Sequence, residues 1–115
     1  MGDKSFPSSH RLLKSEEFNT VFNNRAYSVN NGSFLILAIK NKLSFNRLGV
    51  IVGRKSLPRA VDRNWIKRRL RESFRDLEPL GLDVIALVKP GLCLDVLARK
   101  TIDESLDNLR QKAES

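Results

Sequence analysis

The sequence predicts an α+β fold, a small α/β sandwich in which helices pack on a mixed central sheet. Apolar residues recur with helical or strand-like spacing in the order helix, strand, strand, helix, strand, helix. The chain has 115 residues, so we expect one domain spanning residues 1–115. Hydrophobic residues make up 41% of the chain, which is enough for a core without disulfides or a structural metal.

The N-terminal part is predicted to hold one short helix. The first ten residues contain a proline, serines and a glycine, which favour a flexible lead-in. A helix is expected over Leu12–Asn23, with Ser15 as its N-cap. Phe18, Val21 and Phe22 are three and four residues apart, so they share one face of this helix.

Two strands are expected next. Ser33–Lys40 is apolar at both odd and even positions, which favours a strand covered on both faces. Arg47–Gly53 is rich in β-branched residues. We expect the polar segment Asn41–Asn46 to join the two strands as a hairpin. The pattern of Arg25–Gly32 predicts a loop and leaves open whether it includes another short strand.

The longest helix is predicted over Leu57–Leu77. Pro58 does not oppose this start, because proline is acceptable in the first turn of a helix. A third strand is expected over Asp83–Lys89, and a last helix from about Ala98 to Ala113. The apolar stripe of the long helix consists of Ile66, Leu70, Phe74 and Leu77.

Positive charge is concentrated on one segment. Lys and Arg number 21 against 13 Asp and Glu, a net charge of +8. The segment Arg54–Arg75 holds nine of the basic residues and two acidic ones. Solvated helix faces usually interleave Lys or Arg with Glu, and a membrane-surface helix needs a larger apolar surplus. The pattern therefore favours binding of a phosphate-rich polyanion.

The composition excludes several functions. One cysteine and one histidine cannot form a Cys/His zinc site, and one cysteine cannot form an internal disulfide. The simplest interpretation of this cysteine usage is a reducing, cytoplasmic setting. No window approaches the ~18 apolar residues of a membrane span, and no secretory signal is expected. No motif for nucleophilic, metal-dependent or Gly-loop chemistry occurs, so we expect a chain that is not catalytic by itself.

The segment Arg47–Arg75 reads RLGVIVGRKSLPRAVDRNWIKRRLRESFR and closely resembles the protein component of bacterial ribonuclease P. The family pattern has a strand R-x-G-x-x-V-x-K-K and a helix A-V-x-R-N-R-x-K-R-x-x-R-E-x-F. The N-terminal family pattern R-L-x-x-x-x-x-F-x-x-V-F also fits from Arg11 to Phe22. The resemblance covers about Arg11 to Leu109. The helix matches at Ala60, Val61, Arg63, Asn64, Lys67, Arg68, Arg71, Glu72 and Phe74.

This resemblance implies a left-handed strand–helix–strand crossover and a role in removing the 5′ leader from precursor tRNA. The partners would be the catalytic RNA, which performs the cleavage, and precursor tRNA. Magnesium would be held mainly by the RNA, with the protein's own metal ligands unknown; no protein partner and no membrane is implied. The residues expected to bind the catalytic RNA are Arg63, Asn64, Lys67, Arg68 and Arg71, extended by Arg54, Lys55 and Arg59. The cleft expected to hold the single-stranded leader is lined by Phe18, Phe22, Leu35 and Leu37.

Two departures from the family pattern and two alternatives accompany this interpretation. Trp65 stands where the family usually has arginine, so it is an uncertain contact with the catalytic RNA, where an indole could stack instead. By its place on the helix, Trp65 either covers the core edge or faces a partner. Leu37 is aliphatic where an aromatic is common, so base stacking would rely more on Phe18 and Phe22; by pattern alone both are core candidates. The runner-up function is a non-enzymatic binding module, such as a ribosome-associated RNA binder or a DNA-binding protein. The third class, an autonomous protein nuclease, is rejected because the sequence lacks the catalytic groups that such an enzyme needs.

Overall fold

The computed structural model describes residues 11–12, 14–32, 34–77, 79–90 and 96–114. The lead-in expected over residues 1–10 lies outside this part of the chain. No helix within the described residues is long and apolar enough to span a bilayer. The elements found there are α1 (Ser15–Asn24), β1 (Tyr27–Asn31), β2 (Phe34–Lys40), β3 (Arg47–Ile51), α2 (Ala60–Arg75), β4 (Leu82–Val88) and α3 (Val96–Glu114).

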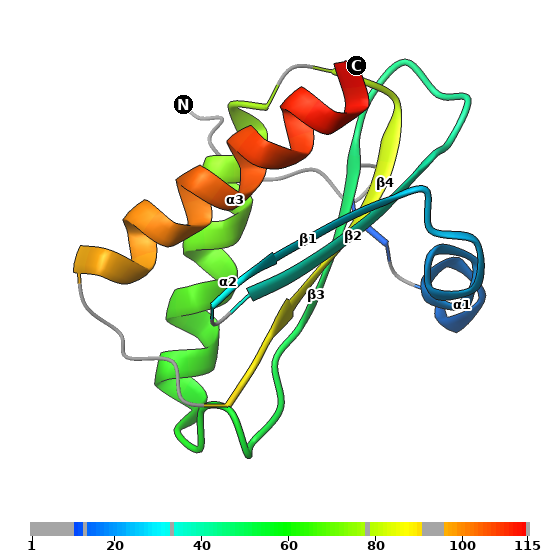
Figure 1. Cartoon of the computed structure of the whole chain (residues 1–115). Coiled ribbons are helices and arrows are strands. Elements are labelled where there is room, and N and C mark those ends of the chain that lie inside the picture. The colour runs from blue at the N-terminus through cyan, green and yellow to red at the C-terminus, as the bar shows by residue number, and fades with distance from the viewer. Residues whose placement is uncertain (1–10, 13, 33, 78, 91–95, 115) are drawn as a thin grey trace, which may run out of the picture.

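The four strands form one mixed sheet in the order β1-β2-β4-β3. The pairs β1–β2 and β2–β4 are antiparallel, whereas β3 runs parallel to β4. Helix α1 lies on one face of the sheet, and α2 and α3 lie on the other (Figure 1). The predicted α+β sandwich is therefore confirmed, and β1 supplies the short additional strand that the sequence left open.

The expected hairpin over Asn41–Asn46 is wrong, because β4 lies between β2 and β3. The segment instead crosses the start of β4, where the amide of Asn41 donates to the carbonyl of Gly81 at 2.8 Å. The side-chain oxygen of buried Asn46 accepts from the amides of Leu80 and Leu82 at 3.0 and 3.1 Å. The polar residues that resemble a turn in the sequence thus fasten, by hydrogen bonds, a loop that crosses the start of β4.

Strand β4 occupies the centre because almost all of it is buried, including both the odd and the even positions. Its parallel neighbour β3 connects to it through α2, which packs over β3. This is the expected strand–helix–strand crossover. The left-handedness of this crossover stays a prediction that rests on the family resemblance.

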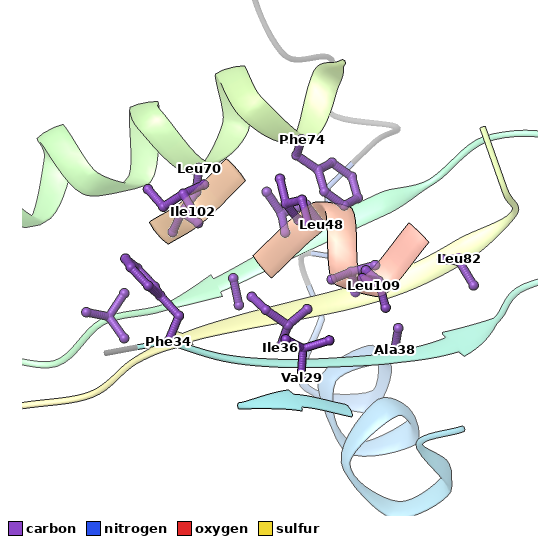
Figure 2. Close-up of a cluster of buried hydrophobic side chains, with 14 of the residues drawn as sticks. Val29, Phe34, Ile36, Ala38, Leu48, Leu70, Phe74, Leu82, Ile102 and Leu109 are labelled. Atoms are coloured by element: carbon purple, nitrogen blue, oxygen red, sulfur yellow. The ribbon is translucent and has the colours of Figure 1, made fainter. Parts of the chain in front are cut away.

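Two apolar clusters lie on the two faces of the sheet. The larger one is buried between the sheet and the helices α2 and α3 (Figure 2). The smaller one lies under α1 and includes Leu12, Val21, Leu37 and Ile85. Side chains drawn in Figure 2 for the larger cluster include Phe34, Ile36 and Ala38 of β2, Leu70 and Phe74 of α2, and Ile102 and Leu109 of α3.

The N-termini of two helices differ from the prediction. Helix α2 begins at Ala60 rather than Leu57, since a residue before proline is driven to extended backbone. Leu57 is nevertheless buried. Helix α1 has Lys14, not Ser15, as its N-cap. The Glu17 carboxylate reaches back and accepts from the Lys14 amide at 3.0 Å.

The contact between α1 and β3 requires a glycine. A Cβ built on Gly49 would lie 2.6 Å from two atoms of the Phe18 ring, which is closer than van der Waals contact permits. The ring of Phe18 therefore rests directly on the backbone of β3.

We predict that Gly49→Ala lowers the free energy of unfolding by about 1–3 kcal/mol, because the ring of Phe18 must move to admit the methyl group. Gly53→Ala is the matched control, since no heavy atom lies within 4 Å of its Cβ position. It should stay within about 0.5 kcal/mol of the parent protein. Urea unfolding of the three proteins measures both effects. Equal stabilities for Gly49→Ala and Gly53→Ala would contradict the close packing.

Candidate nucleic-acid interface

Helix α2 separates its charges between two flanks. Its apolar stripe buries Ile66, Leu70 and Phe74 against the sheet. By helical spacing, the two acidic residues, Asp62 and Glu72, lie on the flank that also carries Arg69. Arg69 and Glu72 form an ion pair there at 3.0 Å. The opposite flank, called here the basic flank, consists of Asn64, Lys67, Arg68 and Arg71.

The side chains of the basic flank are accessible. Asn64 and Arg68 are exposed, and Lys67 is half-buried. Within the described part of the chain, no carboxylate forms an ion pair with Lys67, Arg68 or Arg71. This flank therefore presents uncompensated positive charge to solvent.

The loop before α2 extends the same charge. Arg54 and Lys55 are exposed just after β3, and Arg59 is exposed at the N-cap of α2. Arg59 lies 3.9 Å from the Asp62 carboxylate, a distance at which an exposed pair contributes little. The loop cations predicted from the sequence thus lie on the surface.

Arg63 has a different environment from the other predicted cations. Its guanidinium folds back and donates to the carbonyls of Leu57 and Pro58 at 2.9 and 2.8 Å. These carbonyls belong to the turn that precedes α2, so Arg63 holds this turn in place. Helical spacing already put Arg63 inside the apolar stripe, and the loop bonds explain how a cation is accommodated there.

The basic flank faces the N-terminal segment that lies along β3. Arg11 forms an isolated parallel bridge with Leu48, and the Leu12 amide donates to the Leu48 carbonyl at 2.9 Å. Burial lowers the pKa of Arg71, and the nearby charge of Arg11 lowers it further.

Trp65 lies on the other flank of α2. It is half-buried against the larger apolar cluster, and the guanidinium of Arg69 lies 5.6 Å from its ring centroid. Trp65 therefore covers the core edge on the side of α3, away from the basic flank.

The groove between α2 and α3 is unsuited to a polyanion. Its lining includes the carboxylates of Asp76, Asp103 and Asp107, with Arg110 already paired to Asp107 at 2.7 Å. A phosphate chain would meet these carboxylates, so the α3 side is excluded and the basic flank remains.

The α1 face of the sheet carries a second candidate surface. One cross-strand row consists of Leu35 of β2, Leu87 of β4 and Ile51 of β3, which are partners in register. All three side chains are half-buried, and we call this row the open row. The next row, Leu37 and Ile85 with Gly49, is fully buried under α1.

Of the four predicted cleft residues, Leu35 lies in the open row and Leu37 in the buried row, whereas Phe18 and Phe22 lie on α1. Phe18 and Phe22 are half-buried against the smaller cluster, as is Leu35. Leu37 has only 2% of its surface exposed, so it supports the surface from below. Sequence reasoning missed Ile51 and Leu87, although the two-sided apolar pattern of their strands was the signal.

Both surfaces meet at β3, which is an edge strand. The open row ends at Ile51, and the chain continues through the exposed Arg54 and Lys55 to α2. An apolar strip and a cationic strip therefore adjoin around one edge of the sheet. Apolar side chains receive unstacked bases and cations receive phosphates, so these surfaces together suit a nucleic acid.

The fold and these surfaces define a small α/β protein that binds a polyanion. Comparison with known proteins places it further. The family model described as Ribonuclease P matches residues 6–114. The ribonuclease P protein component of Marinobacter nauticus is 47% identical over 107 residues, covering 91% of this chain and 79% of the relative. That of Marinomonas sp. is 39% identical, covering 98% and 89%.

Solved structures agree with this result. The ribonuclease P protein from Thermotoga maritima has a TM-score of 0.71 and 32% identity, covering 88% of this chain and 96% of that one. A mutant of the Staphylococcus aureus protein has a TM-score of 0.72 and 27% identity, covering 92% and 89%. The chain belongs to the family of ribonuclease P protein components, which are subunits of a ribonuclease of tRNA processing. The alternative of a ribosome-associated or DNA-binding module is not favoured.

Proposed function

We propose that the chain docks on the catalytic RNA of ribonuclease P through the basic flank of α2 and binds the 5′ leader of precursor tRNA along the open row. The observation that carries this proposal is the separation of charge on α2, which leaves one flank without a carboxylate beside an apolar strip. The contacts assigned to the catalytic RNA are Asn64, Lys67, Arg68 and Arg71, with Arg54, Lys55 and Arg59.

The leader is single-stranded, so its bases are free to lie on apolar side chains while its phosphates meet cations. Phe18, Phe22, Leu35, Ile51 and Leu87 offer such a surface. The exposed cations Arg54 and Lys55 follow Ile51 directly in the chain. A duplex such as the acceptor stem does not expose base faces, so this surface favours leader over mature tRNA.

The RNA subunit supplies the chemistry in this proposal. Among the described residues, no three His, Cys, Asp or Glu side chains gather as a metal site. Magnesium prefers phosphate oxygens and keeps several waters, so we assign it mainly to the RNA. The site of action is the bacterial cytoplasm, where precursor tRNA is made.

Reconstitution tests the proposed division of labour. Precursor tRNA is incubated at low magnesium with protein alone, RNA alone, and both together. We expect efficient cleavage only with both, because the protein neutralises phosphates and holds the leader. Cleavage by purified protein after ribonuclease pretreatment would overturn the assignment of catalysis to RNA.

Removing three charges from the basic flank should weaken assembly with the catalytic RNA. For the triple variant Lys67→Ala, Arg68→Ala, Arg71→Ala, the slope of log affinity against log salt should fall in magnitude by about two to three, since each phosphate contact contributes about 0.7–0.9. The melting temperature of the free protein should stay level or rise, because repulsion among the like charges clustered on α2 is relieved.

The matched control removes an equal number of positive charges from β2 and α3. It carries Lys40→Ala, Lys100→Ala and Lys112→Ala, and all three lysines are exposed. Its salt slope should stay close to that of the parent. Equal slopes for both triple variants would show that overall charge, and not the basic flank, drives assembly.

Truncating the open row should weaken binding of precursor tRNA more than of mature tRNA. We expect Leu35→Ala and Phe22→Ala each to lose discrimination. The loss should be up to about 1–3 kcal/mol for Phe22→Ala, the contribution of one base stacked on an aromatic ring, and smaller for Leu35→Ala, because an aliphatic side chain offers apolar contact only. Leu43→Ala is the control, since Leu43 is apolar and 41% exposed but lies in the loop after β2. Binding of both tRNAs is measured with the assembled holoenzyme, and circular dichroism checks the fold. Equal losses for both tRNAs in a folded variant would contradict the leader role.

A further inference from the structure

One arginine connects α1 to the middle of the sheet. The guanidinium of Arg47 binds both carboxylate oxygens of Asp83, with Nε to Oδ1 at 2.8 Å and Nη2 to Oδ2 at 2.6 Å. Its remaining Nη1 donates to Oε2 of Glu17 at 2.8 Å. The hydrogen bond to Asp83 raises the pKa of Arg47, so the cation is present at all ordinary pH values. The side chain of Asp83 is 8% exposed, and those of Arg47 and Glu17 are 22% and 25% exposed.

The contact from Glu17 lies next to the contact from Phe18. These two residues are consecutive in α1, and they dock on Arg47 and Gly49, which are two positions apart and on the same side of β3. The helix is thus held at two adjacent points, one ionic and one apolar. Two points fix its orientation on the sheet as well as its distance from it.

The rest of α1 is held by apolar packing alone: Val21 is buried in the smaller cluster, and Phe22 is half-buried against it. The helix has ten residues, a length that is not stable alone in water, and Val21 is its only buried residue among those described. Loss of the ionic contact would leave α1 held by apolar contacts alone, which are less directional than charge-assisted hydrogen bonds. The ring of Phe22, one turn further along, would then change its position relative to the open row.

We infer that Arg47 is a positioning residue for leader binding, acting through Glu17 to hold α1 where Phe18 and Phe22 border the open row. The inference rests on the proposed leader site. Arg47 itself is committed to two carboxylates, so it contributes geometry and no contact with phosphate.

Glu17→Gln tests the inference. The amide oxygen can still accept from the Lys14 amide, but the charge opposite Arg47 is lost. Glu16→Gln is the matched control, because Glu16 is an exposed neighbour in the same helical turn. The readout is the ratio of holoenzyme affinities for precursor tRNA with a leader and for the leaderless tRNA. A change in fold stability alone does not move this ratio.

We expect Glu17→Gln to reduce the leader-dependent gain in affinity by about three- to tenfold, the range of a partly buried ion pair. Binding of leaderless tRNA and assembly with the catalytic RNA should stay within about twofold, as should every value for Glu16→Gln. If Glu17→Gln does not fold, Arg47→Lys replaces it, since one ammonium cannot span both carboxylates. The same reduction is expected.

Leu35→Ala in the same series separates the two hypotheses. A loss of leader-dependent gain in Leu35→Ala but not in Glu17→Gln or Arg47→Lys would overturn the positioning role and leave the leader site intact. An unchanged gain in all variants would overturn the leader site and the inference with it. A loss in Leu35→Ala and Glu17→Gln, with Glu16→Gln unchanged, supports both.

Discussion

The burial of β4 on both faces is the constraint on which the arrangement of this protein depends. A strand that is apolar at odd and even positions must lie between two others and beneath helices on both sides. Because β4 takes the centre, β3 becomes an edge strand, and α2 must cross from that edge back to the middle of the sheet. The charged helix is thereby placed beside an edge, where a large partner can reach it.

The same register creates the ionic anchor. Arg47 opens β3 and is the direct partner of Asp83 in β4, so the guanidinium and the carboxylate face each other across the parallel pair. The carboxylate of Asp83 is buried, and its burial would destabilise the fold if no cation lay beside it. Asn41 adds a further hydrogen bond to its Oδ1 at 2.9 Å, from the loop that crosses the strand. The central strand thus fixes both the crossing loop and, through Arg47, the first helix.

Local patterns predicted the helices and strands, because spacing of apolar residues reports which face is buried. The stripe Ile66, Leu70 and Phe74 was found in this way, and the charge cluster next to it followed from composition. Strand pairing is not local, so Asn41–Asn46 resembled a hairpin although its ends belong to strands separated by β4. The open row escaped notice for the same reason: Leu35, Ile51 and Leu87 become neighbours only once the register is known.

The basic flank and the open row, which meet at β3, would bind through different interactions, one electrostatic and one apolar. Binding through the basic flank depends on release of counterions, so it is strong at low salt and insensitive to sequence. Contact through the open row depends on apolar area, to which Phe18 and Phe22 add stacking, so it would change little with salt and require unpaired bases. Like charges gathered on the basic flank repel one another, and a bound polyanion would offset that repulsion. In the proposed function, docking on a folded RNA and selection of a single-stranded leader can therefore be adjusted independently, although one edge strand carries both.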